Sequence, residues 1–169
     1  MTTKEKILLD AFNIRGRVIQ RAIEIESAID IYIVEYFSND LAKQIELRAL
    51  IVAPRMTFEN KFQVFSYLVN KYHPEFESEH KNYKKDITYI IEKRNMFAHF
   101  PIDFSDEALK AYEKDGTITF VKLKNSKEFG ISTSISIQSV YYNNLFSMMG
   151  YYFDAIYKLI GPGTASPPA

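Results

Sequence analysis

The 169-residue sequence contains no cysteine and no tryptophan. The absence of cysteine excludes disulfide bonds, thiolate nucleophiles and zinc sites built on cysteine, and it is typical of a reducing compartment. No stretch approaches the roughly 18 apolar residues that a membrane-spanning helix needs. The first residues, MTTKEKILLDAF, lack the continuous apolar core of a signal peptide. We therefore expect a cytoplasmic protein that does not bind a membrane.

The sequence also lacks an excess of charge of either sign. It has 21 basic and 21 acidic residues, which gives a formal net charge of zero. A protein that holds nucleic acid through many phosphate contacts usually has a basic excess. The balance therefore argues against broad, non-specific binding of nucleic acid, although it is compatible with a small local site.

Apolar residues, in contrast, are plentiful. They make up 47% of the chain, and Tyr and Phe alone account for 15%. A chain of this length and composition can bury a substantial core as one domain. We expect a single domain over residues 1–160 and a flexible tail over residues 161–169, GPGTASPPA.

Helical spacing dominates the first hundred residues. Apolar residues recur at steps of three and four along a helix that ends near Ser38–Asp40: Val18, Ala22, Ile25, Ile29, Tyr32 and Tyr36. The preceding KILLDAFNI is also helical, with Gly16 as the place for a bend, and LAKQIELRALIV predicts a shorter helix that stops before Pro54.

Two further helices follow. Thr57 is a predicted N-cap for residues 58–72, in which Phe58, Phe62, Phe65 and Leu68 or Val69 share a face that His73–Pro74 ends. The next helix is predicted from about Ser78 to His99, because Pro101 disfavours helical geometry at Phe100. Its buried side is predicted to comprise Tyr83, Ile87, Ile90 or Ile91, and Ala98.

The last part of the chain changes its pattern. After a predicted loop, TITFVKLK and ISTSISI flank NSKEFG and predict a β-hairpin over residues 117–137. A final helix is predicted from about Ser139 to Ile160. The fold class that we predict is mainly α, a helical bundle with one β-hairpin before the C-terminal helix. We interpret the hairpin as structural, with capping of a cleft as the alternative.

The stretch RNMFAHF places Arg94, Asn95 and His99 at the end of a helix. On an ideal helix Asn95 and His99 lie about 40° apart, whereas Arg94 and His99 lie about 140° apart. An imidazole can exchange a proton near neutral pH, a guanidinium can hold a phosphate, and an amide can orient either group. Together they suit attack of a ribose 2′-hydroxyl on its neighbouring phosphate. The spacing equally fits a solvated arginine, a surface amide and a histidine at the negative end of a helix dipole.

The segment EKRNMFAH, which follows helices that include MTFENKFQVF, resembles the HEPN superfamily, whose signature is Arg, a polar residue such as Asn, a few more residues and then His. Arg94, Asn95 and His99 match that signature. The resemblance implies a helical bundle and metal-independent RNA cleavage that leaves a 2′,3′-cyclic phosphate and a 5′-hydroxyl, without a cofactor. It also implies a homodimer in which two signatures line one cleft, an RNA substrate, and a role as a toxin or in phage defence with a cognate antitoxin or inhibitor protein as partner.

Non-catalytic members of the same family imply an alternative, a dimeric binding or regulatory module. A similar helical arrangement occurs in regulators that resemble the mannitol operon repressor. The neutral charge of the chain does not favour an avid RNA binder, so this alternative stays open.

Other candidate residues lie outside the signature. Glu26 and Asp30 fall on a flank that also carries Ile19, Ile23, Ile33 and Phe37, so one carboxylate could be buried with Arg94 as its partner and support the site; exposure at the edge of the stripe is the other interpretation. The segment HPEFESEH has a composition that could bind a metal, but its spacing matches no established ligand pattern. The segment KNYKK, residues 81–85, is interpreted as a solvated face rather than a phosphate-binding patch. We predict no metal.

Overall fold

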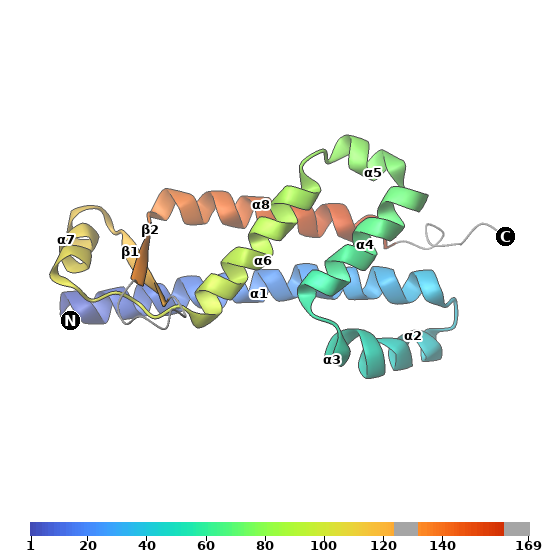
Figure 1. Ribbon diagram of the computed structural model, residues 1–169, viewed down its shortest axis with the longest axis horizontal. Helices are drawn as coiled ribbons and strands as arrows, with labels where there is room; N and C mark the ends of the chain where they lie inside the picture. The colour runs from blue at the N-terminus through green and yellow to red at the C-terminus, as the bar shows by residue number, and fades with distance from the viewer. Residues whose placement is uncertain (124–131, 161–169) are drawn as a thin grey trace. The chain divides into compact units, whose positions relative to one another are not determined.

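The computed structural model describes residues 1–123 and 132–160. The chain is mainly helical with one antiparallel hairpin before the C-terminal helix, which confirms the predicted fold class (Figure 1). The elements are α1 Thr3–Phe37, α2 Leu41–Leu47, the π-helix η1 Arg48–Val52, α3 Ala53–Arg55, α4 Phe58–Tyr72, α5 Pro74–Glu79, α6 Tyr83–His99, α7 Asp106–Asp115, β1 Ile118–Leu123, β2 Ser132–Ile137 and α8 Ser139–Tyr157. Within these residues no helix combines the length and apolar character needed to span a membrane.

The chain divides into two compact units. Unit 1 comprises Met1–Gln20 and Lys93–Ser147, and unit 2 comprises Arg21–Glu92 and the chain from Met148 onward. Helices α1, α6 and α8 each contribute residues to both units. Each unit has its own buried core.

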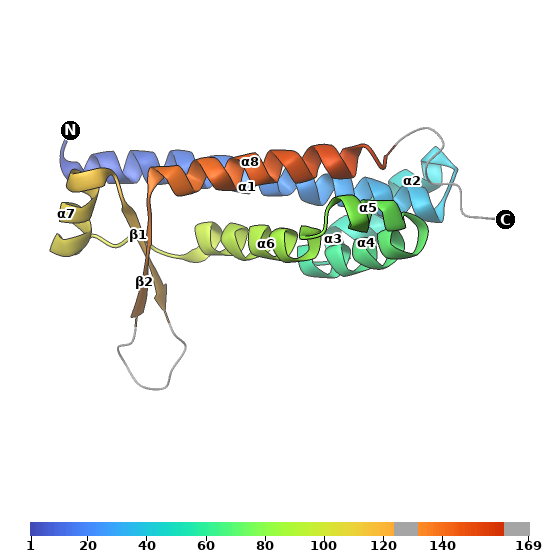
Figure 2. The same ribbon diagram turned by 90° about the horizontal axis from the view of Figure 1, so that it is seen from above.

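In unit 1 the start of α1 contacts α7 (Figure 2). The Thr3 hydroxyl donates to the Glu113 carboxylate over 2.7 Å, and the Tyr112 hydroxyl donates to the Asp10 carboxylate over 2.6 Å. The buried apolar side chains of this unit are Ile7, Ala11, Val18, Met96, Phe97, Ala108, Ile118, Phe120, Ile137, Tyr142 and Leu145.

The hairpin also belongs to unit 1. Its two strands pair with Ile118 opposite Ile137 and Phe120 opposite Ile135. The Phe120 ring meets the Phe97 ring of α6 edge to face, with 5.3 Å between the ring centroids. The hairpin is thus packed against α6 by an aromatic contact. The predicted turn NSKEFG lies outside the described residues, as does the predicted tail over residues 161–169.

In unit 2 helix α4 has the predicted boundaries. The Thr57 hydroxyl accepts the backbone N–H of Asn60 over 3.2 Å and caps the helix, and His73 ends it. The positions predicted to face the core are buried: Phe58, Phe62, Phe65, Leu68 and Val69. The Phe65 ring contacts the Tyr32 ring of α1 edge to face, with 5.2 Å between centroids. This face joins α4 to α1 through aromatic packing.

Several predicted boundaries are wrong. The helix predicted from Ser78 begins at Tyr83, because Pro74 starts a separate short helix, α5, that His80 ends. Pro54 lies in the first turn of α3, so the helical segment continues past it, and α1 runs through Gly16 as one helix.

Two further predictions near the end of α6 are wrong. Ala98 is exposed, and the buried side of the last turns is formed by Met96 and Phe97. The segment predicted as a loop after α6 contains the helix α7. The Ser105 hydroxyl caps the start of α7 by accepting the backbone N–H of Ala108 over 3.3 Å, and the helix ends at Gly116, whose φ is 73°.

Replacement of Ile29 by alanine tests the core of unit 2. Ile29 is fully buried on α1, so Ile29→Ala is expected to lower the free energy of unfolding by roughly 2 to 5 kcal/mol. Ile23 on the same helix is 46% exposed, and Ile23→Ala is expected to change it by about 0.5 kcal/mol or less. Denaturant unfolding of both variants gives the comparison; equal losses would contradict the assigned orientation of α1.

Candidate functional site

The last two turns of α6 carry the three signature residues. Arg94 and Asn95 are half-buried, and the Arg94 guanidinium donates through Nη1 to Oδ1 of Asn95 over 3.0 Å. His99 is exposed in the final turn, and the N–H of Phe100 still bonds to the carbonyl of Met96 over 2.9 Å. The structure therefore brings Arg94 and Asn95 together and presents the imidazole of His99 to solvent.

The carboxyl end of α6 is held from two sides within unit 1. The N–H of Val121 in β1 donates to the carbonyl of Pro101 over 2.9 Å, and the N–H of Asp103 donates to the carbonyl of Thr119 over 2.8 Å. On another side, the Arg15 guanidinium of α1 donates to the carbonyl of Phe100. These contacts fix the backbone that directly follows His99.

Arg15 is a residue that the sequence did not single out for a role. Its guanidinium carbon lies 5.2 Å from the centroid of the Phe120 ring, an arrangement that allows a cation–π interaction. Its Nε–H is buried without a hydrogen-bond partner in the described part of the chain, and burial lowers the pKa of Arg15. The arginine still stays charged at neutral pH. A second guanidinium thus lies beside the end of the signature helix.

The imidazole of His99 makes no hydrogen bond or ion pair with another residue in the described part of the chain. Because α6 is helical through His99, the imidazole keeps its separation of about 140° from Arg94 around the helix axis. A phosphate bound by both residues would have to bridge this angle within one chain, or each signature would have to act with residues of a second copy.

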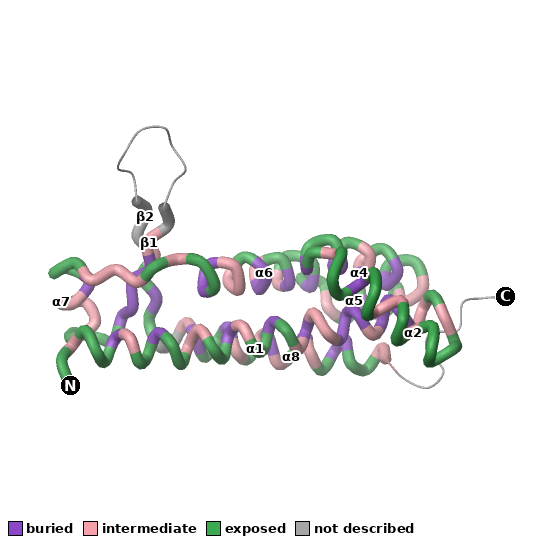
Figure 3. The backbone as a smooth tube through the Cα atoms, turned by 90° about the horizontal axis from the view of Figure 1, so that it is seen from below, coloured by how far each residue is buried: buried purple, intermediate pink, exposed green. Residues whose placement is uncertain are grey.

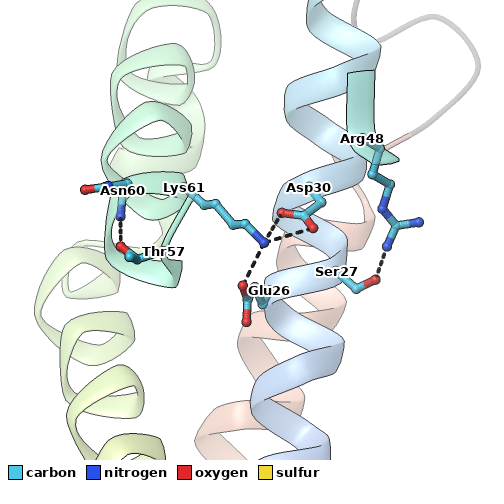
Figure 4. Close-up of polar contacts among 7 residues, drawn as sticks. All are labelled: Glu26, Ser27, Asp30, Arg48, Thr57, Asn60 and Lys61. Carbon is cyan, nitrogen blue, oxygen red and sulfur yellow. Dashed lines mark hydrogen bonds and ion pairs between the residues drawn. The ribbon is translucent and has the colours of Figure 1, made fainter. Parts of the chain in front are cut away.

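Glu26 and Asp30 lie in a different arrangement, an ion cluster in unit 2 (Figure 4). The ammonium of Lys61 on α4 lies 2.7 Å from Oε1 of Glu26 and 3.0 Å from Oδ1 of Asp30. The side chains of Lys61 and Asp30 are only 3% and 5% exposed. The predicted partner, Arg94, is thus corrected to Lys61, and edge exposure is wrong for Asp30.

Arg48 of the π-helix adds a second cation near this cluster. It donates to the hydroxyl of Ser27, the residue that follows Glu26 on α1 (Figure 4). Burial raises the pKa of Asp30, while the hydrogen bond and charge of Lys61 oppose that rise. The cluster therefore ties α4 to α1. A supporting role of Glu26 and Asp30 in chemistry stays a prediction.

The other predicted residues make contacts within unit 2. Nδ1 of His73 lies 3.1 Å from the Glu75 carboxylate, His80 contacts the Tyr151 hydroxyl, and Lys84 pairs with Glu77 over 2.8 Å. Over residues 1–123 and 132–160, no group of three or more His, Asp or Glu side chains is arranged to hold a metal ion.

Comparisons of the chain with protein-family models, with curated proteins and with solved structures found no match. The assignment to the HEPN superfamily stays a prediction from the residues of the signature.

Replacement of Lys61 by methionine tests the ion cluster. Removing one partner leaves two carboxylates unpaired in a mostly buried site, so Lys61→Met is expected to cost about 3 to 5 kcal/mol at neutral pH. Lys85→Met, which removes an exposed lysine of the same unit, is expected to change stability by about 0.5 kcal/mol or less.

The stability loss of Lys61→Met is also expected to depend on pH, in a direction that Asp30 determines. Without Lys61 the pKa of Asp30 in the folded state rises further above its unfolded value, so the folded state binds the proton more readily. The loss of stability in Lys61→Met is therefore expected to shrink as the pH falls through that raised pKa. Adding Asp30→Asn to Lys61→Met is expected to recover part of the lost stability at neutral pH. Unfolding curves measured across pH would contradict this account if the deficit stayed constant.

Proposed function

We propose that the chain is a metal-independent endoribonuclease of HEPN type that acts through Arg94, Asn95 and His99. One observation carries the proposal: the last two turns of α6 combine an exposed imidazole, His99, with an arginine, Arg94, that is hydrogen-bonded to Asn95. The fixed backbone after His99 and the nearby Arg15 support it, because they supply rigidity and a second positive charge.

Each side chain has a role in this proposal. The substrate's own 2′-hydroxyl is the nucleophile, and its attack on the adjacent phosphate breaks the bond to the 5′-oxygen of the next nucleotide. His99 takes the proton from the 2′-hydroxyl and returns it to the departing 5′-oxygen, since an imidazole nitrogen can both accept and donate a proton. Arg94 stabilises the negative charge that builds up on the phosphoryl oxygens, and Asn95 orients its guanidinium.

A second copy of the chain would complete the site, because α6 alone keeps Arg94 and His99 on different sides of the helix. An exposed apolar pair in unit 1 supports a homodimer: Leu9 is 50% exposed, Phe12 is 60% exposed, and their spacing of three places them on one face of α1. In this proposal the function belongs to a toxin or a phage-defence protein that a cognate antitoxin or inhibitor protein restrains.

The same geometry favours a second candidate, a non-catalytic dimeric binding or regulatory module. In this alternative the Arg94–Asn95 bond is a surface contact, and His99 stabilises the negative end of the α6 dipole. The zero net charge of the chain also agrees better with a binding module than with an avid RNA binder.

RNA cleavage in the presence of a chelator separates the two candidates. With total RNA as the probe, wild-type protein is expected to cleave, and His99→Ala is expected to lose about 10²- to 10⁴-fold in rate, the usual effect of removing a general acid or base. Arg94→Ala is expected to lose about 10²- to 10³-fold. His80→Ala, which removes a histidine of unit 2, serves as the control and is expected to cleave normally.

A substitution in the substrate tests the nucleophile. In an oligonucleotide that spans a mapped cleavage position, a 2′-deoxy nucleotide at that position is expected to stop cleavage. Normal cleavage of the deoxy substrate, dependence on a divalent ion, or full activity of His99→Ala would contradict the proposal and favour the binding module.

The proposed dimer has its own test. Light scattering at tens of micromolar is expected to give the mass of two chains for wild-type protein and of one chain for Leu9→Asp/Phe12→Asp, because the charges would be buried without partners. Tyr157→Asp, at an exposed position of unit 2, is the matched control and is expected to leave the dimer intact. A monomeric wild-type protein would contradict the proposal.

A further inference from the structure

An open groove of about 400 Å³ in unit 2 is formed by the end of α1 and by α4, and no signature residue lines it. Four of its eight lining residues are aromatic, namely Tyr36, Phe37, Tyr67 and Tyr72, and the others include Leu68 and Lys71. The Tyr36 hydroxyl donates to the Tyr72 hydroxyl over 2.8 Å, which joins the two helices at the groove. We call this feature the aromatic groove.

Two rings of the aromatic groove are largely exposed to solvent. Tyr67 is 63% exposed and Phe37 is 61% exposed. Beyond Phe37 the exposed apolar side chains continue along the chain, with Leu41 at 69% and Ile45 at 60% on α2, a helix in which no residue is buried (Figure 3). Within the groove itself, Phe37 and Tyr67 place two exposed rings in one depression, as at an interaction surface.

The groove also carries a positive charge. The ammonium of Lys71 lies 5.1 Å from the centroid of the Tyr72 ring and 5.9 Å from that of Tyr67. No carboxylate forms an ion pair with Lys71 in the part of the chain that the structure describes, and contact with the Tyr72 hydroxyl raises the pKa of Lys71. The groove thus offers an ammonium that a ligand's carboxylate can neutralise.

We propose that the aromatic groove binds a segment of a partner protein that places one large apolar side chain against Phe37 and Tyr67 and an acidic side chain next to Lys71. Aromatic residues are enriched at the centres of protein interfaces, and four of the eight residues that line the groove are aromatic. A nucleic acid is disfavoured because the groove offers one lysine and the chain has no basic excess. The proposal does not depend on RNA cleavage.

Selection from a library of short displayed peptides tests the proposal. Peptides selected on wild-type protein are expected to pair an aromatic or large aliphatic residue with Asp or Glu within one helical turn. Selection on Lys71→Glu is expected to replace the acid with Lys or Arg. Lys71→Glu and the Tyr67→Ala variant used below are expected to fold, because Tyr67 and Lys71 are exposed, and circular dichroism checks this.

The binding of one selected peptide gives the quantitative result. Its affinity is expected to fall about tenfold or more on Tyr67→Ala, as at an interface hot spot, and to stay unchanged on Tyr157→Ala, another exposed tyrosine of unit 2. Equal selection on wild type and Lys71→Glu, selected peptides without an acid, or insensitivity to Tyr67→Ala would overturn the proposal. Loss of self-association in Tyr67→Ala would also overturn it, because the groove would then bind a second copy.

Discussion

The 35-residue helix α1 is the element on which both units depend. Isolated helices have little stability in water, and most of the stability of a helix in a protein comes from burying its apolar face. The apolar positions of α1 are buried in unit 1 at Ile7 and Val18 and in unit 2 at Ile25 and Ile29. Because α1 runs unbroken, the same helix supplies Arg15 to the end of α6 and two carboxylates to the ion cluster.

The sequence predicted those elements whose own apolar residues repeat at helical spacing. Helix α4 was found with its cap because five large apolar residues share one face and Thr57 precedes them. The sequence prediction missed helix α7, although Ala108, Leu109 and Tyr112 repeat at helical spacing, because the helix that carries this stripe is only 10 residues long and contains one buried residue. The residues that enclose the helix, Ser105 and Gly116, are a second signal. Local capping thus adds information where the apolar stripe is short.

The sequence could indicate only those residues of the candidate site that lie close together along the chain. Arg94, Asn95 and His99 stand out because three residues with chemical functions occur within six positions. The contact of Arg15 with Phe100 joins residues 85 positions apart, and such a contact follows from packing rather than from local pattern. Lys61 gave a weak signal, since it interrupts the apolar face of α4, and a lysine there requires a buried acidic partner.

We propose that the end of α6 performs chemistry on RNA rather than only ending a helix. The chemical ends of the RNA products are the decisive test, because attack by the 2′-hydroxyl leaves a 2′,3′-cyclic phosphate on one fragment and a 5′-hydroxyl on the other. Mass spectrometry of RNA incubated with the protein in chelator is expected to find both ends with wild-type protein and neither with His99→Ala. Products with a 3′-hydroxyl and a 5′-phosphate, or the same cyclic ends from both proteins, would contradict the account.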